Sequence, residues 1–343
     1  MTTLVLAADQ AAHRARLDVL DSLPPMTRVL VTGGAGTIGS AVVRRLLRDP
    51  AYDVRVSDQR EAPQWMREGC EVHTGDLRVL EQARAATAGC SHVIHLAAIV
   101  GGIANFHKLP YTLTEVNNAL YNGVVRAAIE HEVERFTYVS SSMVFEQAQE
   151  FPTPESYLPR CPTPISAYGF SKLTGEVYVK AAHAEHGLPF TICRPFNAYG
   201  PGEVPEDEPG IAHMVPDVIR KVLEGRRPLP IFGDGTQTRT LTYVDDIADG
   251  IVTAMGAAAG LNEDFNISAA EEMTVADIAR VIWESCGKDP AQFELEHLPT
   301  FEVDVVRRWP DVSKAKDLLG WEAQTDLRDG IARTVAWLRE REG

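Results

Sequence analysis

Residues 28–39 read Arg28-Val-Leu-Val-Thr32-Gly33-Gly-Ala-Gly36-Thr-Ile-Gly39, an apolar run that leads straight into a glycine-rich loop. A short apolar run bounded by glycines predicts a buried strand. Glycines at 33, 36 and 39 permit a tight turn, let the backbone approach a pyrophosphate, and allow a helix to pack closely on the strand. Asp58 follows at the end of the next expected strand, where its carboxylate can accept hydrogen bonds from both ribose hydroxyls. The whole series predicts a dinucleotide-binding turn.

Short apolar strands alternate with helices after this loop. The expected elements are helix 38–47, strand 53–57, strand 71–74, helix 79–88, strand 92–96, helix 114–131, strand 135–139, a helix that carries Tyr168 and Lys172, and strand 190–193. This alternation predicts a parallel sheet with helices on both faces, a doubly wound α/β fold of the Rossmann type. We expect residues 27–195 to form this domain and residues 1–26 to form an extension before it.

The sequence pattern changes beyond residue 195, where prolines interrupt shorter stretches of helical spacing. Helical spacing returns at 275–286 and 327–339. Residues 196–343 are therefore expected to form mainly a smaller mixed α/β lobe that binds substrate. The exception is the stretch of about 240–270, which is expected to add strands to the sheet of the first domain.

Charge and cysteine content exclude several classes of partner. The 343 residues carry a formal net charge of −15, so a nucleic-acid backbone or an anionic membrane would be repelled. The five cysteines are odd in number and lack metal-binding spacing, which predicts no metal site and a reducing, cytoplasmic location. No run of 18 apolar residues is present.

A tyrosine and a lysine stand four residues apart in Tyr168-Gly-Phe-Ser-Lys172. On a helix they share one face, where the ammonium group can hold the phenol ready to ionise. Tyr-x-x-x-Lys occurs by chance in many proteins, so the pair gains weight only beside the glycine loop and the cluster Ser140-Ser-Ser142, which ends an apolar run. Together these features suit removal of a proton and a hydride from an alcohol.

These three features belong to a longer series of motifs along the chain. They are Gly33-x-x-Gly36-x-x-Gly39, Gly75-Asp76-Leu77, His95-Leu-Ala-Ala98, Ser140-Ser-Ser142, Tyr168-x-x-x-Lys172, Arg194-Pro-Phe-Asn-Ala-Tyr-Gly-Pro201, Gly233-Asp-Gly-Thr-Gln-Thr-Arg239 and Tyr243-Val-Asp-Asp246. With them the chain resembles, over residues 28–340, the extended short-chain dehydrogenases/reductases of the NAD-dependent nucleotide-sugar epimerase/dehydratase family. The resemblance implies a sheet that binds NAD, a carboxy-terminal lobe that binds a nucleoside diphosphate sugar, and a homodimer formed through helices 114–131 and 167–185.

The cofactor site follows from the glycine loop together with this resemblance. Asp58 would repel the 2′-phosphate of NADP, which favours NAD, whereas the nearby Arg60 argues in the other direction. The predicted cofactor-binding residues are Gly33, Gly36, Thr37, Ile38, Gly39, Asp58, Asp76, Leu77, Leu96, Ala97, Ala98, Tyr168, Lys172 and Pro195.

The catalytic roles are assigned to three residues. Tyr168 is predicted to be the base, with Lys172 lowering its pKa, and Ser141 occupies the place where the family keeps a Ser or Thr that hydrogen-bonds the reacting oxygen. The resemblance further implies substrate binding by Ile103, Ser142, Met143, Asn197, His213, Phe232, Arg239 and Arg307. Of these, Asn197, Arg239 and Arg307 are expected at the diphosphate, with Arg308 as an alternative to Arg307.

The residues after Ser141 bear on which reaction follows oxidation at C4. By the resemblance, dehydratases carry an Asp-Glu pair where this chain has Ser142 and Met143, decarboxylases have Glu at the Met143 place, and GDP-sugar epimerases have a catalytic Cys there. A thioether cannot shuttle protons. His213 in His213-Met-Val-Pro216 is similar to an acid/base residue of the GDP-sugar members, and it needs a different partner here.

The reaction that needs no further acid or base is 4-epimerisation, in which hydride leaves C4 and returns to the other face of the sugar. We therefore expect an epimerase that acts at C4 of a UDP-hexose or a UDP-hexuronate. The alternatives are a GDP-sugar epimerase of the 3,5-type and a keto-sugar reductase, both of which would use His213. A dehydratase, a decarboxylase and a non-catalytic NAD-binding regulator fit the residues less well, the regulator because Ser141, Tyr168 and Lys172 are all present.

Overall fold

The computed structural model describes residues 26–100, 108–206, 213–300 and 305–342. Its centre is a seven-stranded sheet of order β11-β6-β5-β4-β1-β2-β3 in which every neighbouring pair is parallel. The strands are β1 (Thr27–Thr32), β2 (Tyr52–Asp58), β3 (Glu71–Thr74), β4 (His92–His95), β5 (Arg135–Val139), β6 (Phe190–Pro195) and β11 (Glu263–Ile267). The predicted doubly wound parallel sheet is confirmed.

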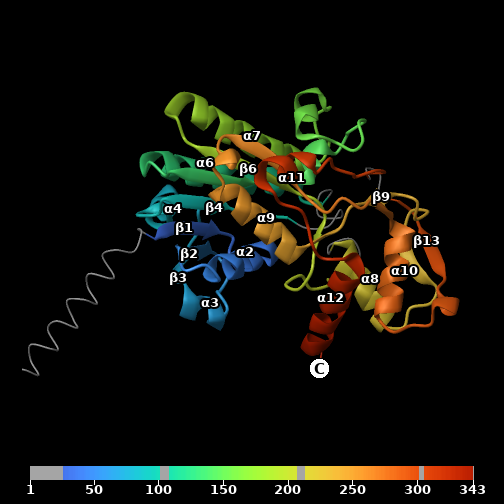
Figure 1. Cartoon of the computed structure of the whole chain (residues 1–343). Coiled ribbons are helices and arrows are strands. Elements are labelled where there is room, and N and C mark those ends of the chain that lie inside the picture. Colours follow the sequence, from blue (N-terminus) through green and yellow to red (C-terminus); the bar gives the residue numbers. More distant parts are fainter. Residues whose placement is uncertain (1–25, 101–107, 207–212, 301–304, 343) are drawn as a thin grey trace, which may run out of the picture.

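Successive side chains of the central strands point to opposite faces and enter two separate cores. In β1, Val29 and Val31 pack beneath helices α2 (Thr37–Leu47) and α9 (Val244–Gly256), whereas Leu30 packs on the other side. That second side is covered by α4 (Leu80–Thr87), α6 (Pro110–Glu130) and α7 (Ala167–His186). Figure 1 shows these helices around the sheet. Burial on both faces explains why the strands read as continuous apolar runs.

A second lobe has its own apolar core, formed by α8, α10, α12 and β8 with the segments around them. The lobe's elements are β7 (Ala198–Tyr199), α8 (Met214–Leu223), β8 (Leu229–Phe232), β9 (Thr238–Arg239), β10 (Thr242–Tyr243), β12 (Met273–Thr274), α10 (Val275–Ser285), β13 (Leu295–Leu298) and α12 (Leu327–Glu342). Its strands form three two-stranded pairs, β10-β7, β12-β9 and β13-β8. In Figure 1, α8, α10 and α12 lie together beside the sheet domain.

The remaining short elements are α3 (Gln64–Gly69), α11 (Ser313–Leu319) and the 3-10 helices η1 (Ser142–Phe145), η2 (Glu155–Arg160), η3 (Ala258–Gly260) and η4 (Pro290–Gln292). Of the strands expected within about 240–270, β11 joins the large sheet beside β6, while β10 pairs with β7 outside it. The expected extension, except for Met26, lies outside the described residues. No helix in the described ranges combines the length and apolarity needed to span a bilayer.

Candidate active site

A cavity of about 1340 Å³ lies along the carboxyl ends of the parallel strands, between the sheet and the second lobe. Residues just after β1, β4, β5 and β6 line one side of it, and residues of α8 and β8 line the other. This edge is where ligands bind in open α/β sheets. The volume is large enough to hold two ligands of nucleotide size side by side.

The glycine loop forms one end of the cavity. Gly33 has φ +69°, and a Cβ atom there would lie 2.8 Å from the backbone nitrogen of Ala97. A Cβ atom on Gly39 would overlap the carbonyl oxygen of Gly33. Helix α2 begins after Gly36, so its unpaired amide groups lie at the same place. These features fit a pyrophosphate, which needs close backbone approach and the positive end of a helix.

Asp58 ends β2 at the rim of this region. Its carboxylate accepts hydrogen bonds from the backbone nitrogen of Ala35 at 3.0 Å and from the Arg60 side chain at 3.3 Å. The side chain of Asp58 is therefore held in place beside the loop, as recognition of a ribose requires. Arg60, which argued for NADP in the sequence, pairs with Asp58 and partly neutralises it.

Most of the predicted cofactor-binding residues line the cavity. They are Gly33, Gly36, Thr37, Ile38, Gly39, Asp58, Leu77, Leu96, Ala97, Ala98, Tyr168, Lys172 and Pro195. Asp76, the remaining predicted residue, is not among the lining residues. Its carboxylate pairs with Arg78 at 2.6 Å, while its neighbours Gly75 and Leu77 face the cavity.

Tyr168 and Lys172 stand on successive turns of α7, whose first turn is capped by the Ser166 hydroxyl. Both side chains line the cavity yet are buried, with 7% and 4% of their surface exposed. Lys172 Nζ donates a hydrogen bond to the carbonyl oxygen of Val139 at 2.9 Å and lies 5.4 Å from the Tyr138 ring centre. The ammonium is thus fixed between β5 and α7.

Burial sets the acid–base properties of these two groups. Burial raises the pKa of Tyr168 to about 12, although a hydrogen bond with Ser141 and the charge of Arg308 act in the opposite direction. Burial lowers the pKa of Lys172 to about 8, and Glu176 opposes that change. Without further positive charge, Tyr168 is protonated at neutral pH. A cationic nicotinamide ring in this cavity would favour the phenolate.

The region beyond Tyr168 is enclosed by Ser142, Met143 and Arg308. The Arg308 guanidinium donates a hydrogen bond to Asn197 Oδ1 at 3.0 Å and lies 2.8 Å from the sulfur of Met143. Met143 is buried and offers no proton-transfer group. This part of the cavity therefore combines an apolar wall with a fixed cation.

The structure places Arg308, not Arg307, in the cavity. Arg307 is exposed, forms two hydrogen bonds with Glu272 at 2.7 and 2.8 Å, and lies over the rings of Phe151 and Trp309. Consecutive residues of an extended segment point in opposite directions, so only one of the two arginines can face inward.

His213 lines the cavity just before α8. Its Nδ1 lies 2.5 Å from Glu203 Oε1, which also accepts a hydrogen bond from the His213 backbone nitrogen at 3.1 Å. The His213 side chain is 49% exposed, and the adjacent Glu203 carboxylate raises the pKa of His213 above its usual value. Glu203 therefore orients the ring and favours its charged form.

The far end of the cavity is formed by the second lobe, with Phe232 and Arg239 among its lining residues. Arg239 donates hydrogen bonds to the carbonyl oxygens of Thr238 and Val305. Lys221 lies 5.6 Å from the Phe232 ring centre and pairs with Asp217 at 2.7 Å. The predicted contact Ile103 lies outside the described residues.

Sequence reasoning missed Glu203 and Lys221 and named Arg308 only as an alternative. The Asp217–Lys221 spacing is a detectable helix pair. No local signal links Glu203 to a histidine ten residues later. In the described part of the chain, no three His, Cys, Asp or Glu side chains are grouped as a metal site would require.

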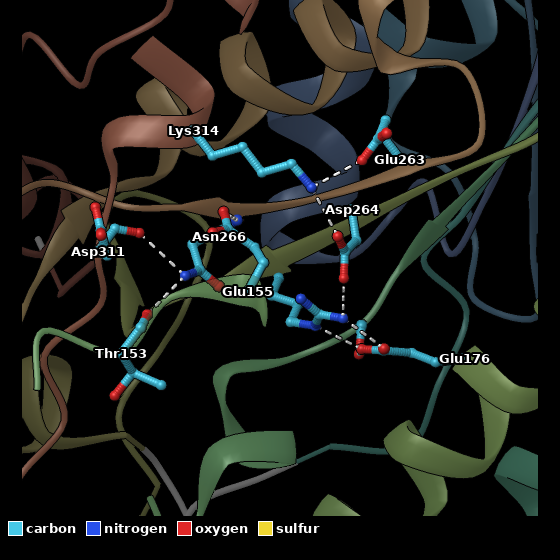
Figure 2. Close-up of polar contacts among 10 residues, drawn as sticks. Thr153, Glu155, Glu176, Glu263, Asp264, Asn266, Asp311 and Lys314 are labelled. Carbon is cyan, nitrogen blue, oxygen red and sulfur yellow. Dashed lines mark hydrogen bonds and ion pairs between the residues drawn. The ribbon is translucent and has the colours of Figure 1, made fainter. Parts of the chain in front are cut away.

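The segment that carries Arg308 is held against the sheet domain by hydrogen bonds of Asn266. The Asn266 side-chain amide in β11 donates to the carbonyl oxygens of Thr153 and Asp311, each at 3.0 Å. The backbone nitrogen of Asn266 donates to Glu155 Oε1 at 2.7 Å. Figure 2 shows these contacts, which join three segments far apart in the sequence. They fix the position of the chain just after Arg308.

Comparisons with known proteins agree with this geometry. The family model described as the NAD dependent epimerase/dehydratase family matches residues 29–268. An uncharacterised UDP-glucose epimerase of Bacillus subtilis is 30% identical over 332 residues, which cover 91% of this chain and 98% of that protein.

Two solved structures share the fold. One is the UDP-glucose 4-epimerase of Thermotoga maritima, solved with UDP-glucose, with a TM-score of 0.82 and 31% sequence identity. The match covers 92% of this chain and 100% of that chain. The UDP-glucuronic acid 4-epimerase of Bacillus cereus, solved with UDP-glucuronic acid and NAD, has a TM-score of 0.81 and 28% identity over 92% of this chain and 99% of its own. By its sequence, its fold and the glycine loop that fits NAD, the chain belongs to the NAD-dependent epimerase/dehydratase family.

Proposed function

We propose that the protein is an epimerase that inverts C4 of a nucleoside diphosphate sugar through a transient 4-keto sugar. The observation that carries the proposal is the position of Tyr168, which faces the same cavity as the glycine loop and contacts Ser141. A base, a hydrogen-bond donor for the reacting oxygen and a dinucleotide site thus share one enclosed space.

In the proposed reaction Tyr168, as a phenolate, accepts the proton of the C4 hydroxyl while the C4 hydride is removed. Ser141 donates a hydrogen bond to the same oxygen, and Lys172 stabilises the phenolate. NAD, when bound, supplies the hydride acceptor. The keto sugar then rotates in the cavity so that its other face is presented. Tyr168 returns the proton to the oxygen, and the hydride returns to the opposite face of C4. Atoms and charge balance over the cycle, so no co-substrate is consumed.

Neighbouring residues support C4 inversion over elimination or decarboxylation. Ser142 and Met143 lie against the cavity at 3% and 6% exposure, and neither can act as the acid or base that removal of water or carbon dioxide would require. Met143 serves as an apolar wall against which the keto sugar can rotate. Arg308, with Asn197 and Arg239, is assigned to anionic groups of the substrate, because an Arg guanidinium suits phosphate or carboxylate oxygens.

A UDP-hexose or a UDP-hexuronate is the substrate class we propose. The two structural neighbours solved with UDP-glucose and UDP-glucuronic acid support it, at 31% and 28% identity. A second candidate is a GDP-sugar epimerase of the 3,5-type or a keto-sugar reductase. The pairing of His213 with Glu203 favours it, because a carboxylate beside an imidazole supports acid–base transfer.

Reaction in deuterated water with a panel of UDP-, GDP- and dTDP-sugars separates these candidates. Inversion at C4 by hydride transfer is expected to leave C3, C4 and C5 without deuterium, as read by NMR of the product, and to consume no NADPH. Deuterium at C3 or C5 that disappears in His213→Asn would establish the 3,5-type reaction instead. Net loss of NADPH would identify a reductase.

We also propose a reducing, cytoplasmic location, which the five cysteines without disulfides support.

We further propose a homodimer that forms through α6 and α7. On α7, Phe170 and Val177 are 45% and 59% exposed and stand seven residues apart, with Tyr178 beside them and Tyr111 exposed on α6. An exposed apolar stripe at this spacing suits helix pairing between subunits.

Replacing Val177 by Glu is therefore expected to convert a dimer into a monomer at micromolar concentration, because a charge would be buried in an apolar contact. Light scattering coupled to size-exclusion chromatography measures the mass. Leu318→Glu is the matched control, since Leu318 on α11 is 48% exposed and lies elsewhere. A dimer that persists in Val177→Glu would contradict this interface.

A further inference from the structure

A buried ion pair lies directly behind the proposed catalytic residues. Glu176 stands one turn after Lys172 on α7, and its side chain is 1% exposed. Arg194 of β6, whose side chain is fully buried, donates two hydrogen bonds to its two carboxylate oxygens at 2.8 and 2.7 Å. Figure 2 marks the contacts at Glu176 with dashed lines. A fork of two parallel bonds fixes both side chains.

The pair continues toward the surface as a chain of alternating charges. Arg194 also donates to Asp264 at 2.6 Å, and Lys314 of α11 donates to Asp264 at 2.9 Å and to Glu263 at 2.8 Å. Arg194 therefore shares its single positive charge between two carboxylates. As a result, Glu176 keeps part of its negative charge for other neighbours.

The same carboxylate contacts the strand end that presents Ser141. The hydroxyl of Ser140 donates to Glu176 Oε1 at 2.6 Å, and Ser140 is buried. On the other side of the turn, the guanidinium of Arg194 lies 5.3 Å from the ring centre of Phe145, the last residue of η1. The ion pair thus contacts both ends of the turn that holds Ser141 and Met143, at Ser140 through Glu176 and at Phe145 through Arg194.

Lys172 is the second neighbour of Glu176. The titratable groups around the ammonium are His95 from β4, Tyr138 from β5 and Glu176 from α7, with Tyr121 of α6 edge-on to Tyr138. Tyr168 stands one turn before Lys172 on α7. Burial first, and then Lys172 itself, lower the pKa of His95 to about 3, so His95 is neutral. Among these groups Glu176 is the one that favours the charged form of Lys172.

A structural role alone accounts poorly for this arrangement. A buried ion pair adds little net stability compared with apolar residues of the same volume, because both charges lose their hydration. Its direct contacts with Ser140 and its position one turn from Lys172 instead connect it to the reaction.

We infer that Glu176 is a positioning residue for catalysis, which keeps Lys172 an ammonium ion and, through Ser140, holds the strand end that presents Ser141. Arg194 orients the Glu176 carboxylate through two parallel hydrogen bonds. The inference rests on the proposed roles of Tyr168, Lys172 and Ser141, and it holds for any sugar substrate that these residues oxidise.

The test is Glu176→Gln, because a glutamine can still accept the hydrogen bond from Ser140 but carries no charge. Loss of the charge is expected to lower the pKa of Lys172 by about one unit. NMR of the NAD-saturated protein labelled at lysine Cε measures it directly, with the Lys172 signal identified by its absence in Lys172→Met. In steady-state kinetics the basic limb of the kcat profile is expected to move to lower pH by a similar amount, with KM changed less than about threefold.

Two further variants keep the test decisive. Asp264→Asn breaks the same network one step farther from Lys172, so it is expected to lower the unfolding temperature and to move the Lys172 titration by clearly less than Glu176→Gln does. Glu176→Gln/Arg194→Met also removes the buried arginine that has lost one of its two carboxylate partners, and it replaces the single variant if that variant fails to fold. An unchanged Lys172 pKa in a folded Glu176 variant, or an equal shift in Asp264→Asn, would overturn the inference. The NMR measurement needs no substrate. If no nucleotide sugar is converted to product, that result would count against the proposed function and not against this inference.

Discussion

Tyr168→Phe is expected to lower kcat by at least about 10³-fold, because it removes the proposed base while keeping the ring that fills the site. The phenol is the group proposed to take the C4 proton, and no other phenol described at the cavity stands one turn from Lys172. Turnover of the best nucleotide sugar, measured by NMR, gives the rate, and the NAD released on denaturation shows that the cofactor site is intact.

The control for this variant is Tyr157→Phe. Tyr157 is also buried, but it packs with Val144 and Phe196 in a separate apolar cluster and is not a lining residue of the cavity. It is expected to retain wild-type turnover within about threefold, since its hydroxyl accepts a long hydrogen bond, 3.4 Å, from the backbone nitrogen of Gln149, away from the cavity. Wild-type turnover in Tyr168→Phe would remove Tyr168 from the mechanism.

Gly39→Val is expected to yield protein that no longer copurifies with NAD. Any side chain at this position would overlap the carbonyl oxygen of Gly33, which is backbone and cannot rotate away. Helix α2 would be pushed from β1, so its first amides would no longer converge with Gly33 on a pyrophosphate. The NAD content after denaturation, and the rise in unfolding temperature on adding NAD, measure the loss.

Ser40→Ala is the matched control beside it. It deletes only the hydrogen bond from the Ser40 hydroxyl to the Gly34 carbonyl oxygen, at 3.2 Å, and is expected to cost about 1 kcal/mol of stability while NAD remains bound. Full NAD content in a folded Gly39→Val would show that the loop tolerates a shift of the helix, and the assigned role of Gly39 would then be wrong.

The sheet was predictable because each strand is buried on two faces and therefore reads as an apolar run. Strands Glu71–Thr74 and Arg135–Val139 have the predicted bounds, and the helix that carries Tyr168 begins at Ala167 after a Ser cap. Helix α3 was not predicted, since its six residues are too short to show a period. Likewise, β10 is two residues long, and its pairing with β7 depends on how the lobe folds back.

Those parts of the site that lie within one short sequence motif could be predicted. Those parts that form where residues distant in the sequence meet could not. The glycine loop and the Tyr–Lys pair are local, and the structure brings both to one cavity. The choice between Arg307 and Arg308 depends on the register of an extended segment, which Glu272 and Asn197 set from elsewhere in the chain. The Glu176–Arg194–Asp264 network joins a helix and two strands through contacts between residues 18 and 70 positions apart, and no spacing rule finds it.

The contacts of Asn266 with Thr153 and Asp311 bear on how the enzyme matures during synthesis. The first six sheet strands and the glycine loop are complete once residue 195 has left the ribosome, whereas Arg308 takes its place only when the stretch around 311 has docked beside β11. The cavity is therefore completed only by residues near the carboxy terminus. Premature termination near residue 300 would remove Arg308 from the proposed sugar site and, with Ala315 and Trp321, part of the apolar core that lies beneath α2 and α9.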